Sequence, residues 1–483
     1  MTARLIGLLL AACVAAPGAL AQSPPAVVQA EADPDAVAVA PPLLLDEVLR
    51  ASARSAPQIV EALARVRQAE GRALSAEGAF DTVFDVDGRS RLLGYYDGTV
   101  VQGRATQPLR DNGGYVYGGY RLSRGDFPVY EDEAFTNRLG EVKVGALFAL
   151  LRDRLVDARR TRIDLAGSDI DIARFETAAV AIGVQRRTID AYQNWVAAGF
   201  RLRAYRELLD LAESRRGALE RQVELGARPR ILLVENDQNL VRRRGLVVRA
   251  EQDFAAAANT LSLFYRDAEG LPVLVGPERL PDDPNALAGP SARAIVQERP
   301  DLQQILARID QSVARLALAE NDLRPRLDLV GELGKDVGPQ GLSGSTRTPL
   351  EAIAGFRFSV PLQRREAKGR VAEARAEIDG LQTRARFLRE QIGVEVQGIQ
   401  IAVGAAERLL AIAEQERELA ERLAQAERRR FDLGSSDFFL VNQREETATD
   451  ARVRQVDAAA RIASARAELA AATADRAVLG LTP

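Results

Sequence analysis

The stretch FDLGSSDFFLVNQREE (Phe431–Glu446) interrupts a long run of Ala, Arg, Glu and Leu that is otherwise typical of unbroken helix. A second stretch, LGARPRILLVENDQNL (Leu225–Leu240), also begins with Leu-Gly inside a charged, helical run. Glycine supplies the left-handed backbone position that ends a helix. After the second glycine, Ser435, Ser436 and Asp437 are residue types that cap the start of the next helix. Each stretch therefore predicts a hairpin between two helices.

The two hairpins belong to two copies of an internal repeat. Pro57 and Pro300 are 243 positions apart, each early in a helical run, and the same offset pairs Asp85 with Asp328. In both copies a helical run is followed by an alternating, strand-like run, a glycine-rich section and a second strand-like segment. Each repeat is thus predicted to contain a helix, a strand, a loop, a strand, a very long helix, the Leu-Gly break and a last helix.

The predicted boundaries follow this order. The first repeat covers 43–270, with strands at about 82–94 and 141–151, a long helix at about 151–225 and a tip at 225–230. A connector covers 271–298. The second repeat covers 299–475, with strands at about 325–335 and 351–361, a long helix at about 364–433 and a tip at 433–437, before a tail at 476–483.

The N-terminus has the pattern of an export signal. Arg4 precedes the apolar run LIGLLLAACVAA, and small residues ending at Ala21 precede Gln22. This predicts a signal peptide at 1–21, followed by a flexible Ala/Pro-rich leader at 22–42. The segment that ends at Cys13 also resembles a bacterial lipobox, which makes Cys13 a candidate for lipidation. Both alternatives stay open, and each predicts an exported chain.

Composition excludes several function classes. The formal net charge is −3, with 65 Lys and Arg against 68 Asp and Glu, so no basic face for nucleic acid is indicated. There is no histidine, and Cys13 is the only cysteine. Zinc sites, Ser-His or Cys-His nucleophiles and imidazole acid–base chemistry are therefore not expected. We predict no catalytic site, cofactor or metal, and no enzymatic activity.

The long helices predict a coiled coil or a helical barrel. A helix from 151 to 225 would extend on the order of 110 Å at a rise of 1.5 Å per residue, which is too long for the core of an ordinary globular domain. The counterpart in the second repeat carries an approximate heptad seam formed by Leu409, Ile412, Leu419, Leu423 and Ala426. A soluble periplasmic coiled-coil scaffold is one alternative that explains these helices, but it does not explain the strands.

The strands and the tyrosines favour a membrane barrel. Beyond the N-terminus the sequence has no run of 18 apolar residues, so a membrane-spanning form would be a closed β-barrel. Six of the nine tyrosines cluster with glycines between the two strands of the first repeat, as in a barrel's interfacial girdle or external loop: Tyr95, Tyr96, Tyr115, Tyr117, Tyr120 and Tyr130. Four predicted strands per chain cannot close a barrel, which predicts an oligomer.

From about Leu43 to Thr473, the order of elements and the segment FDLGSSDFFLVNQREETATDARV resemble the TolC family of outer-membrane channel proteins. The resemblance implies a mainly α fold with a β membrane portion. It further implies a homotrimer whose twelve-stranded barrel, four strands per chain, lies in outer-membrane lipid of a Gram-negative bacterium. The barrel would continue into a periplasmic helical coiled-coil barrel. A periplasmic adaptor protein and an inner-membrane transporter would complete an efflux pump or a type I secretion system.

The resemblance also implies roles for residues at the tips. It places adaptor docking at Leu225, Gly226, Ala227, Arg228, Leu433, Gly434, Ser435 and Ser436. Family members commonly narrow the tunnel with carboxylates a few positions beyond the second tip glycine. This chain has Leu440 and Gln443 at those positions, and its nearest carboxylate is Asp437. The implied constriction is therefore a Leu440 ring with Asp437 at its mouth, although Asp437 also suits a helix cap.

Overall fold

The computed structural model describes residues 41–282, 299–340 and 349–481. The predicted signal peptide, Cys13, the leader up to residue 40 and most of the 271–298 connector lie outside the described residues. Everything below therefore concerns the part of the chain that carries the two repeats.

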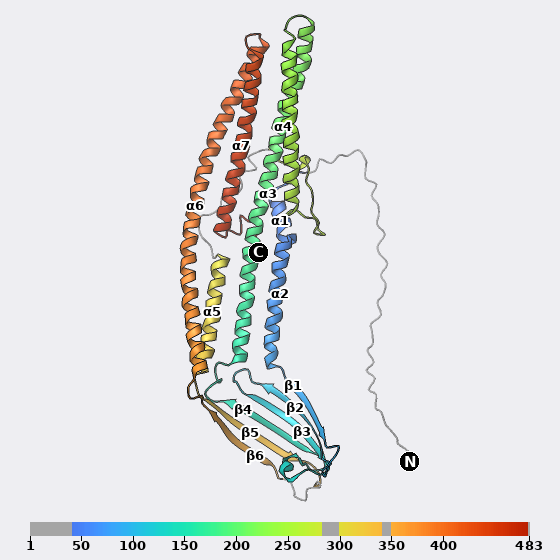
Figure 1. The fold of residues 1–483 in the computed structure, drawn as a ribbon, viewed down its shortest axis with the longest axis vertical. Coiled ribbons are helices and arrows are strands. Elements are labelled where there is room, and N and C mark those ends of the chain that lie inside the picture. Colours follow the sequence, from blue (N-terminus) through green and yellow to red (C-terminus); the bar gives the residue numbers. More distant parts are fainter. Residues whose placement is uncertain (1–40, 283–298, 341–348, 482–483) are drawn as a thin grey trace, which may run out of the picture. The chain divides into compact units, whose positions relative to one another are not determined.

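Seven α-helices are described, and two of them dominate the molecule. The helices are α1 (Leu45–Ser55), α2 (Pro57–Glu77), α3 (Ala158–Glu224), α4 (Ile231–Ser262), α5 (Pro300–Asn321), α6 (Arg365–Asp432) and α7 (Phe438–Ala472). At 67 and 68 residues, α3 and α6 extend about 100 Å each. Figure 1 shows α2 and then α4 beside α3, and α5 and then α7 beside α6.

The internal repeat is visible in where elements begin. Helices α2 and α5 both start with proline at the first helical position, Pro57 and Pro300, where the missing N–H costs nothing. The strands that follow them start at Val83 and Arg326, again 243 residues apart. Helix α3 starts at Ala158 rather than near 151, because the side chain of Asp157 accepts hydrogen bonds from the next backbone N–H groups at 2.7 and 3.1 Å.

One antiparallel sheet contains six strands in sequence order. They are β1 (Val83–Ser90), β2 (Thr99–Pro108), β3 (Tyr115–Arg124), β4 (Glu141–Ala149), β5 (Arg326–Asp336) and β6 (Glu351–Ser359). Strands β1, β4, β5 and β6 lie where strands were predicted, whereas β2 and β3 lie inside the stretch predicted to be a loop. The prediction of four strands per chain is therefore wrong. A β2–β3 hairpin is inserted between β1 and β4.

Glycines hid the inserted hairpin from the pattern of the sequence. Strands are depleted in glycine, and Gly103 of β2 and Gly118 of β3 replace side chains that would have shown the alternation. Two glycines of the sheet lie beside rings of the neighbouring strand, and a Cβ added at Gly103 would lie 3.3 Å from the ring of Phe84. A Cβ added at Gly145 of β4 would lie 2.5 Å from the ring of Tyr117, which therefore lies over this glycine. Aromatic side chains on one strand thus cover glycines on the next.

The two faces of the sheet differ in character. Side chains alternate along a strand, and the register places all charged side chains on one face except Arg124 and Lys335, which lie near the outer ends of their strands. The opposite face presents exposed apolar side chains: Phe84, Val86, Val101, Val116, Val142, Val144, Phe148, Leu329, Leu333, Phe356 and Phe358. An apolar outer face with a polar opposite face is typical of a membrane barrel wall.

The main buried cluster lies where α1, α3, α4 and α7 meet. Trp195 is fully buried there, with its ring centroid 5.9 Å from that of Tyr192 and 6.1 Å from that of Phe254. The hydroxyl of Tyr192 donates a hydrogen bond to the backbone oxygen of Leu43 at 2.8 Å, and burial raises the pKa of Tyr192 to about 12. This cluster ties the start of the described chain to the middle of the helical part.

The leucine seam predicted on α6 is not buried within the chain. The upper half of α6 packs on α7, and its buried positions include Ala406, Ala413 and Ala420, at heptad spacing. Leu419, in contrast, is 57% exposed, and Leu409, Ile412 and Leu423 are similar. Among the described helices, α6 alone has a window long and apolar enough to cross a membrane by length and composition, and only 17% of that window is buried. The seam is therefore an exposed apolar stripe.

Candidate functional site: the helical tips and the ion cluster below them

Both helical tips end in the same backbone motif. Gly226 and Gly434 have φ angles of +73° and +75°, in the left-handed region that favours glycine. At the first tip, the N–H of Gly226 donates to Val223 at 3.0 Å and the N–H of Ala227 donates to Gln222 at 2.8 Å. The second tip makes the same two bonds at 2.9 and 2.8 Å. This pair of bonds is a Schellman motif, which satisfies the last carbonyls of α3 and α6.

The predicted caps at the second tip are wrong in detail. Asp437 occupies the N-cap position of α7 in an extended conformation, but its side chain makes no capping hydrogen bond. The hydroxyl of Ser435 donates to the backbone oxygen of Arg430 at 2.9 Å, and that of Ser436 donates to the carboxylate of Glu427. The serines therefore close the end of α6 rather than the start of α7, because the turn points their hydroxyls backwards.

The residues implied for docking lie at two exposed ends. Leu225 and Leu433 are each 83% exposed, and Gly226, Ala227, Gly434 and Ser435 are exposed with them. Arg228 is half-buried instead, because its guanidinium lies 5.2 Å from the ring centroid of Phe431 in the other hairpin. The two tips are thus in contact, and each presents a leucine to its surroundings.

The residues implied for a constriction share one side of the start of α7. Asp437 and Gln443 are exposed and Leu440 is half-buried. The opposite side of this turn is buried and carries Val441 and Glu445. The structure therefore leaves the three candidates on a surface that faces away from the neighbouring helices of the same chain.

A buried ion cluster that was not predicted lies below the tips. The carboxylate of Glu445 on α7 is fully buried and receives hydrogen bonds from Arg215 of α3, from Arg428 of α6 at 2.8 Å and from Arg243 of α4 at 3.3 Å. One carboxylate thus joins four helices and both hairpins. Asn442 strengthens the junction, because its side-chain oxygen accepts from Arg215 at 2.9 Å.

The electrostatics of the cluster follow from its burial. Burial alone would raise the pKa of Glu445, but Arg215, Arg428 and Arg243 outweigh it and hold the pKa below its usual value. Burial also lowers the pKa of Arg243, although Glu445 favours its charged form. The second nitrogen of Arg243 donates to the backbone oxygen of Leu208 at 2.8 Å. A buried charge of this kind is tolerated only when its partners are in place.

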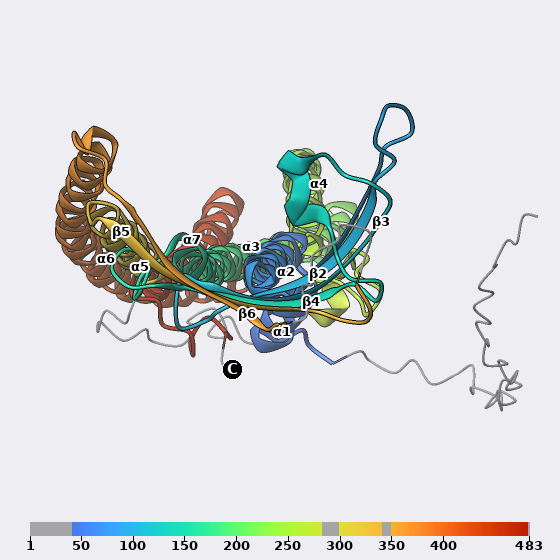
Figure 2. The ribbon, with the colours of Figure 1, turned by 90° about the horizontal axis from the view of Figure 1, so that it is seen from below.

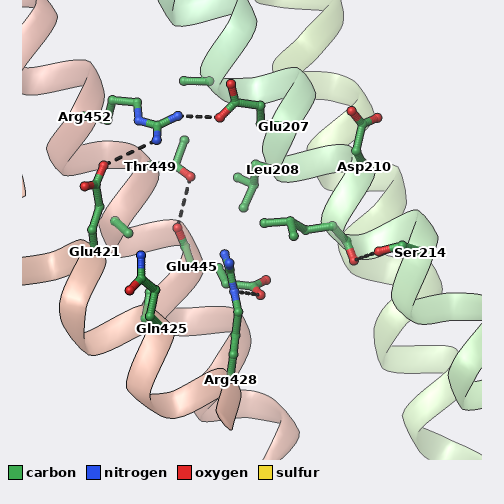
Figure 3. A pocket seen from close by; sticks show the side chains of 14 residues that line it. Glu207, Leu208, Asp210, Ser214, Glu421, Gln425, Arg428, Glu445, Thr449 and Arg452 are labelled. Carbon is green, nitrogen blue, oxygen red and sulfur yellow. Dashed lines mark hydrogen bonds and ion pairs between the residues drawn. The ribbon is translucent and has the colours of Figure 1, made fainter. Parts of the chain in front are cut away.

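A polar cavity of about 570 Å³ separates α3 from α6 and α7 beside the cluster. Figure 3 shows Glu207 of α3 and Glu421 of α6 joined through Arg452 of α7 on one side of this cavity. Arg428 and Glu445 lie on the other side. The walls of the cavity are therefore linked by side-chain ion pairs, not by apolar packing.

Sequence patterns carry little signal for this cluster. Arg215 and Glu445 are 230 positions apart, and each lies in a run of charges that is typical of a solvated helix face. In the described part of the chain, no group of three or more acidic residues or other ligand types is placed to hold a metal ion. The site is an arrangement of ion pairs and exposed tips, without the geometry of a metal centre.

Comparisons with known proteins place this fold. The model of the family described as Outer membrane efflux protein matches residues 292–475. Three solved channels are similar to the chain. They are Campylobacter jejuni CmeC (15% identity, TM-score 0.57, 89% of this chain and 85% of that one), Vibrio cholerae VceC (14%, 0.58, 89% and 95%) and Neisseria gonorrhoeae MtrE (12%, 0.59, 89% and 88%). No curated protein matches the chain.

A sheet with an apolar outer face, continued by paired helices of about 100 Å, defines a membrane channel with a long extension. Residues 292–475 match the model of the outer membrane efflux protein family, the TolC family, and 89% of the chain has the fold of solved outer-membrane channels. The chain is an efflux channel of the bacterial outer membrane with a periplasmic helical extension, and members of this family are not enzymes. Such channels are trimeric parts of tripartite pumps, which sets aside the alternative of a soluble scaffold.

Proposed function

We propose that three copies of this chain close into a passive exit duct, with tips that dock a periplasmic adaptor protein and receive substrate from an inner-membrane transporter. The observation that carries the proposal is the pair of unpaired sheet edges, β1 and β6. In lipid, backbone groups at an open edge have no water to bind, so each edge needs a partner strand.

The two edges fit each other. The alternation of the sheet makes β1 and β6 antiparallel in direction, so β6 of one copy can pair with β1 of the next in the same antiparallel sense. Every residue of both strands is exposed in the single chain. Three copies of a six-stranded sheet give a barrel of 18 strands, which is wide enough to leave an aqueous lumen.

The helices offer a second contact between copies. Val234, Val241 and Val248 form an exposed heptad stripe on α4, and Figures 1 and 2 show α4 and α6 at opposite sides of the molecule. Val241 lies 15 residues after Gly226, and Leu419 of α6 lies 15 residues before Gly434. Because both helices run to a tip with the same rise per residue, the two stripes lie at matching heights. We propose that α4 of one copy packs on α6 of the next.

The tips suit a docking role. Each chain presents two tips with the same backbone motif and an exposed leucine, Leu225 or Leu433, so a trimer presents six similar knobs at its periplasmic end. An adaptor with grooves for a short apolar side chain would bind such knobs. The proposed docking residues are those implied by the family: Leu225, Gly226, Ala227, Arg228, Leu433, Gly434, Ser435 and Ser436.

We propose that the ion cluster holds the periplasmic end of the duct closed. Glu445 holds the α3–α4 hairpin and the α6–α7 hairpin together, so the hairpins cannot separate without exposing or breaking this junction. We place the constriction at Asp437, Leu440 and Gln443, on the side of α7 away from Glu445. Docking at the tips would then act on the constriction through the start of α7.

Fractionation tests the proposed duct. Protein extracted by detergent from the outer-membrane fraction should migrate as a trimer in unheated gels and as a single chain after heating. Recovery as a soluble monomer from the periplasmic fraction would contradict the proposal.

A further inference from the structure

The connection between β3 and β4 is longer than a hairpin needs. It covers residues 125–140 and includes a short 3₁₀ segment, η2 (Val129–Ala134), whereas hairpin loops usually have two to five residues. A loop of this length is uncommon in a compact domain and is often functional. It lies at the end of the sheet far from the helices (Figure 1), which is the outer end of the channel.

The segment lies over the charged face of the sheet. A cavity of about 640 Å³ separates the two, and its lining joins Tyr130, Glu131 and Ala134 of the segment to sheet residues that include Asp87 and Arg121. Except for Gly88, which has no side chain, these sheet residues belong to the charged face. Figure 2 shows the short helical segment, in teal, on the concave side of the curved sheet, which is the side of a barrel's lumen.

Buried hydrogen bonds hold the end of the segment that leads into β4. Thr136 and Ser123 are 5% and 4% exposed, and they bond through the N–H of Ser123 at 3.0 Å and the N–H of Thr136 at 2.8 Å. The N–H of the neighbouring Asn137 donates to the carboxylate of Asp336 in β5 at 2.8 Å. The segment is therefore bonded to the charged face across two strands.

An ion pair and an aromatic pair hold its middle. Arg91, just beyond β1, lies 2.6 Å from Glu131, and both side chains are only 33% and 25% exposed. The rings of Phe127 and Phe135 meet edge to face at 5.1 Å. Phe127 packs against Gly98 so closely that a Cβ there would lie 2.6 Å from its ring. Contacts of several kinds thus fix the segment in one place.

We infer that residues 125–140 form a constriction inside the lumen of the outer-membrane barrel, one from each subunit. This inference rests on the proposed duct. The inserted β2–β3 hairpin widens the barrel, and the segment that follows it occupies part of the added lumen. Val129 and Tyr130 are 90% and 82% exposed, and they are the side chains of the segment that would meet a passing solute.

Thiol labelling in planar bilayers tests the inference. In the Cys13→Ser chain, Val129→Cys places a single thiol on the segment, and Leu93→Cys places one in the β1–β2 turn, where the side chain is 96% exposed. That turn continues the sheet beyond its end and does not cover its face (Figure 2). A bulky cationic methanethiosulfonate should lower single-channel conductance stepwise, up to three steps, for Val129→Cys and leave it unchanged for Leu93→Cys.

A charge swap supplies a second measurement. Arg91→Glu places two carboxylates against each other, so the segment should leave the wall and the current should become noisier. Arg91→Glu with Glu131→Arg should restore the wild-type trace. Two outcomes would overturn the inference in a wild type that conducts. In the first, Val129→Cys is shown by its mass to be labelled and conducts as well as before labelling. In the second, the Val129→Cys thiol resists labelling while the Leu93→Cys thiol reacts. A wild type that forms no channel would instead contradict the proposed duct.

Discussion

Eleven residues beyond its tip glycine, each repeat carries an acidic residue, but the two residues have different surroundings. In the first repeat, Asp237 lies 2.8 Å from Arg216, and both side chains are about half exposed. In the second repeat, Glu445 is fully buried among three arginines from three helices. The tips themselves share one backbone motif and one exposed leucine. The repeats therefore keep the same tip while only the second uses this position to join the hairpins.

The strands show the same kind of divergence. The first repeat has the inserted hairpin β2–β3 and the segment at 125–140, whereas in the second repeat β5 pairs with β6, the next described strand. The tips and long helices of one copy must end at the same height as those of the next copy. A barrel wall, in contrast, accepts additional strands in pairs, because a pair leaves the direction of the edge strands unchanged. Variation is thus easier to accommodate in the sheet than at the tips.

Replacing each of the two acidic residues with alanine should give the largest difference, measured as the free energy of unfolding that each variant loses. Glu445→Ala leaves Arg243 buried without its carboxylate, which should cost about 3–5 kcal/mol. Asp237→Ala removes an exposed pair and should cost about 0–1 kcal/mol. Denaturant unfolding in detergent, with digestion by trypsin near the arginine-rich tips as a second probe, measures the difference. Equal losses for both variants would show that the buried cluster contributes no more than a surface pair.

Valine at the tip glycines should give the next largest effect. Gly226→Val and Gly434→Val force a β-branched residue to positive φ, at about 1–3 kcal/mol of strain each, although no atom lies within 4 Å of the added Cβ. Trimers should assemble, while adaptor crosslinking and export should fail equally for both tips. Gly217→Val, inside α3 and equally free of neighbours, is the control. Normal transport in the tip variants would remove the tips from the docking surface.

Acid should loosen the junction that Glu445 makes between the two hairpins. The folded pKa of Glu445 lies below its usual value of 4.5, so the stability that it contributes is present above that value and is lost as pH falls through the folded pKa. Glu445→Gln should remove this dependence. Protease sensitivity of the tips between pH 6 and pH 3 is the measurement, with Asp237→Asn as the control. A wild type and a Glu445→Gln variant with the same pH profile would contradict this assignment.

Single-channel conductance should show the smallest difference. Leu440→Ser replaces the proposed apolar ring with a small polar group, which widens and wets the constriction and should raise conductance. Asp437→Asn should mainly change cation preference. Leu232 holds the matching position, six residues beyond the first glycine, so Leu232→Ser is the paired control. A larger increase from Leu232→Ser would move the constriction to the first tip.

The sequence predicted what local chemistry determines. The Leu-Gly breaks located both hairpins because positive φ requires glycine, and Pro57 and Pro300 marked the starts of matching helices. The β2–β3 hairpin was missed because Gly103 and Gly118 removed the alternation that identifies strands. The capping role of Asp437 was wrong because a residue's type does not fix the direction of its side chain.

The ion cluster could not be predicted for a different reason. Arg215, Arg243 and Arg428 become partners of Glu445 only when four helices are packed, and each lies in a charged run like many others in the chain. The leucine stripe of α6 was predicted to be a seam, but the sequence did not say which helix covers it. Contacts between distant segments were thus the part that required a structure.

Cross-linking β1 to β6 tests the central claim, an 18-stranded barrel closed by three chains, most directly. In the Cys13→Ser chain, one cysteine at Asp85 or Asp87 of β1 is combined with one at Gly355 or Arg357 of β6, all on the charged face. Side chains opposite each other on paired antiparallel strands have Cβ atoms about 4.5–5.5 Å apart, close enough for a disulfide. At least one combination should give, after oxidation, a heat-stable ladder that ends at three chains and disappears on reduction. No cross-link in any combination, or links that join β1 to β1, would contradict the account.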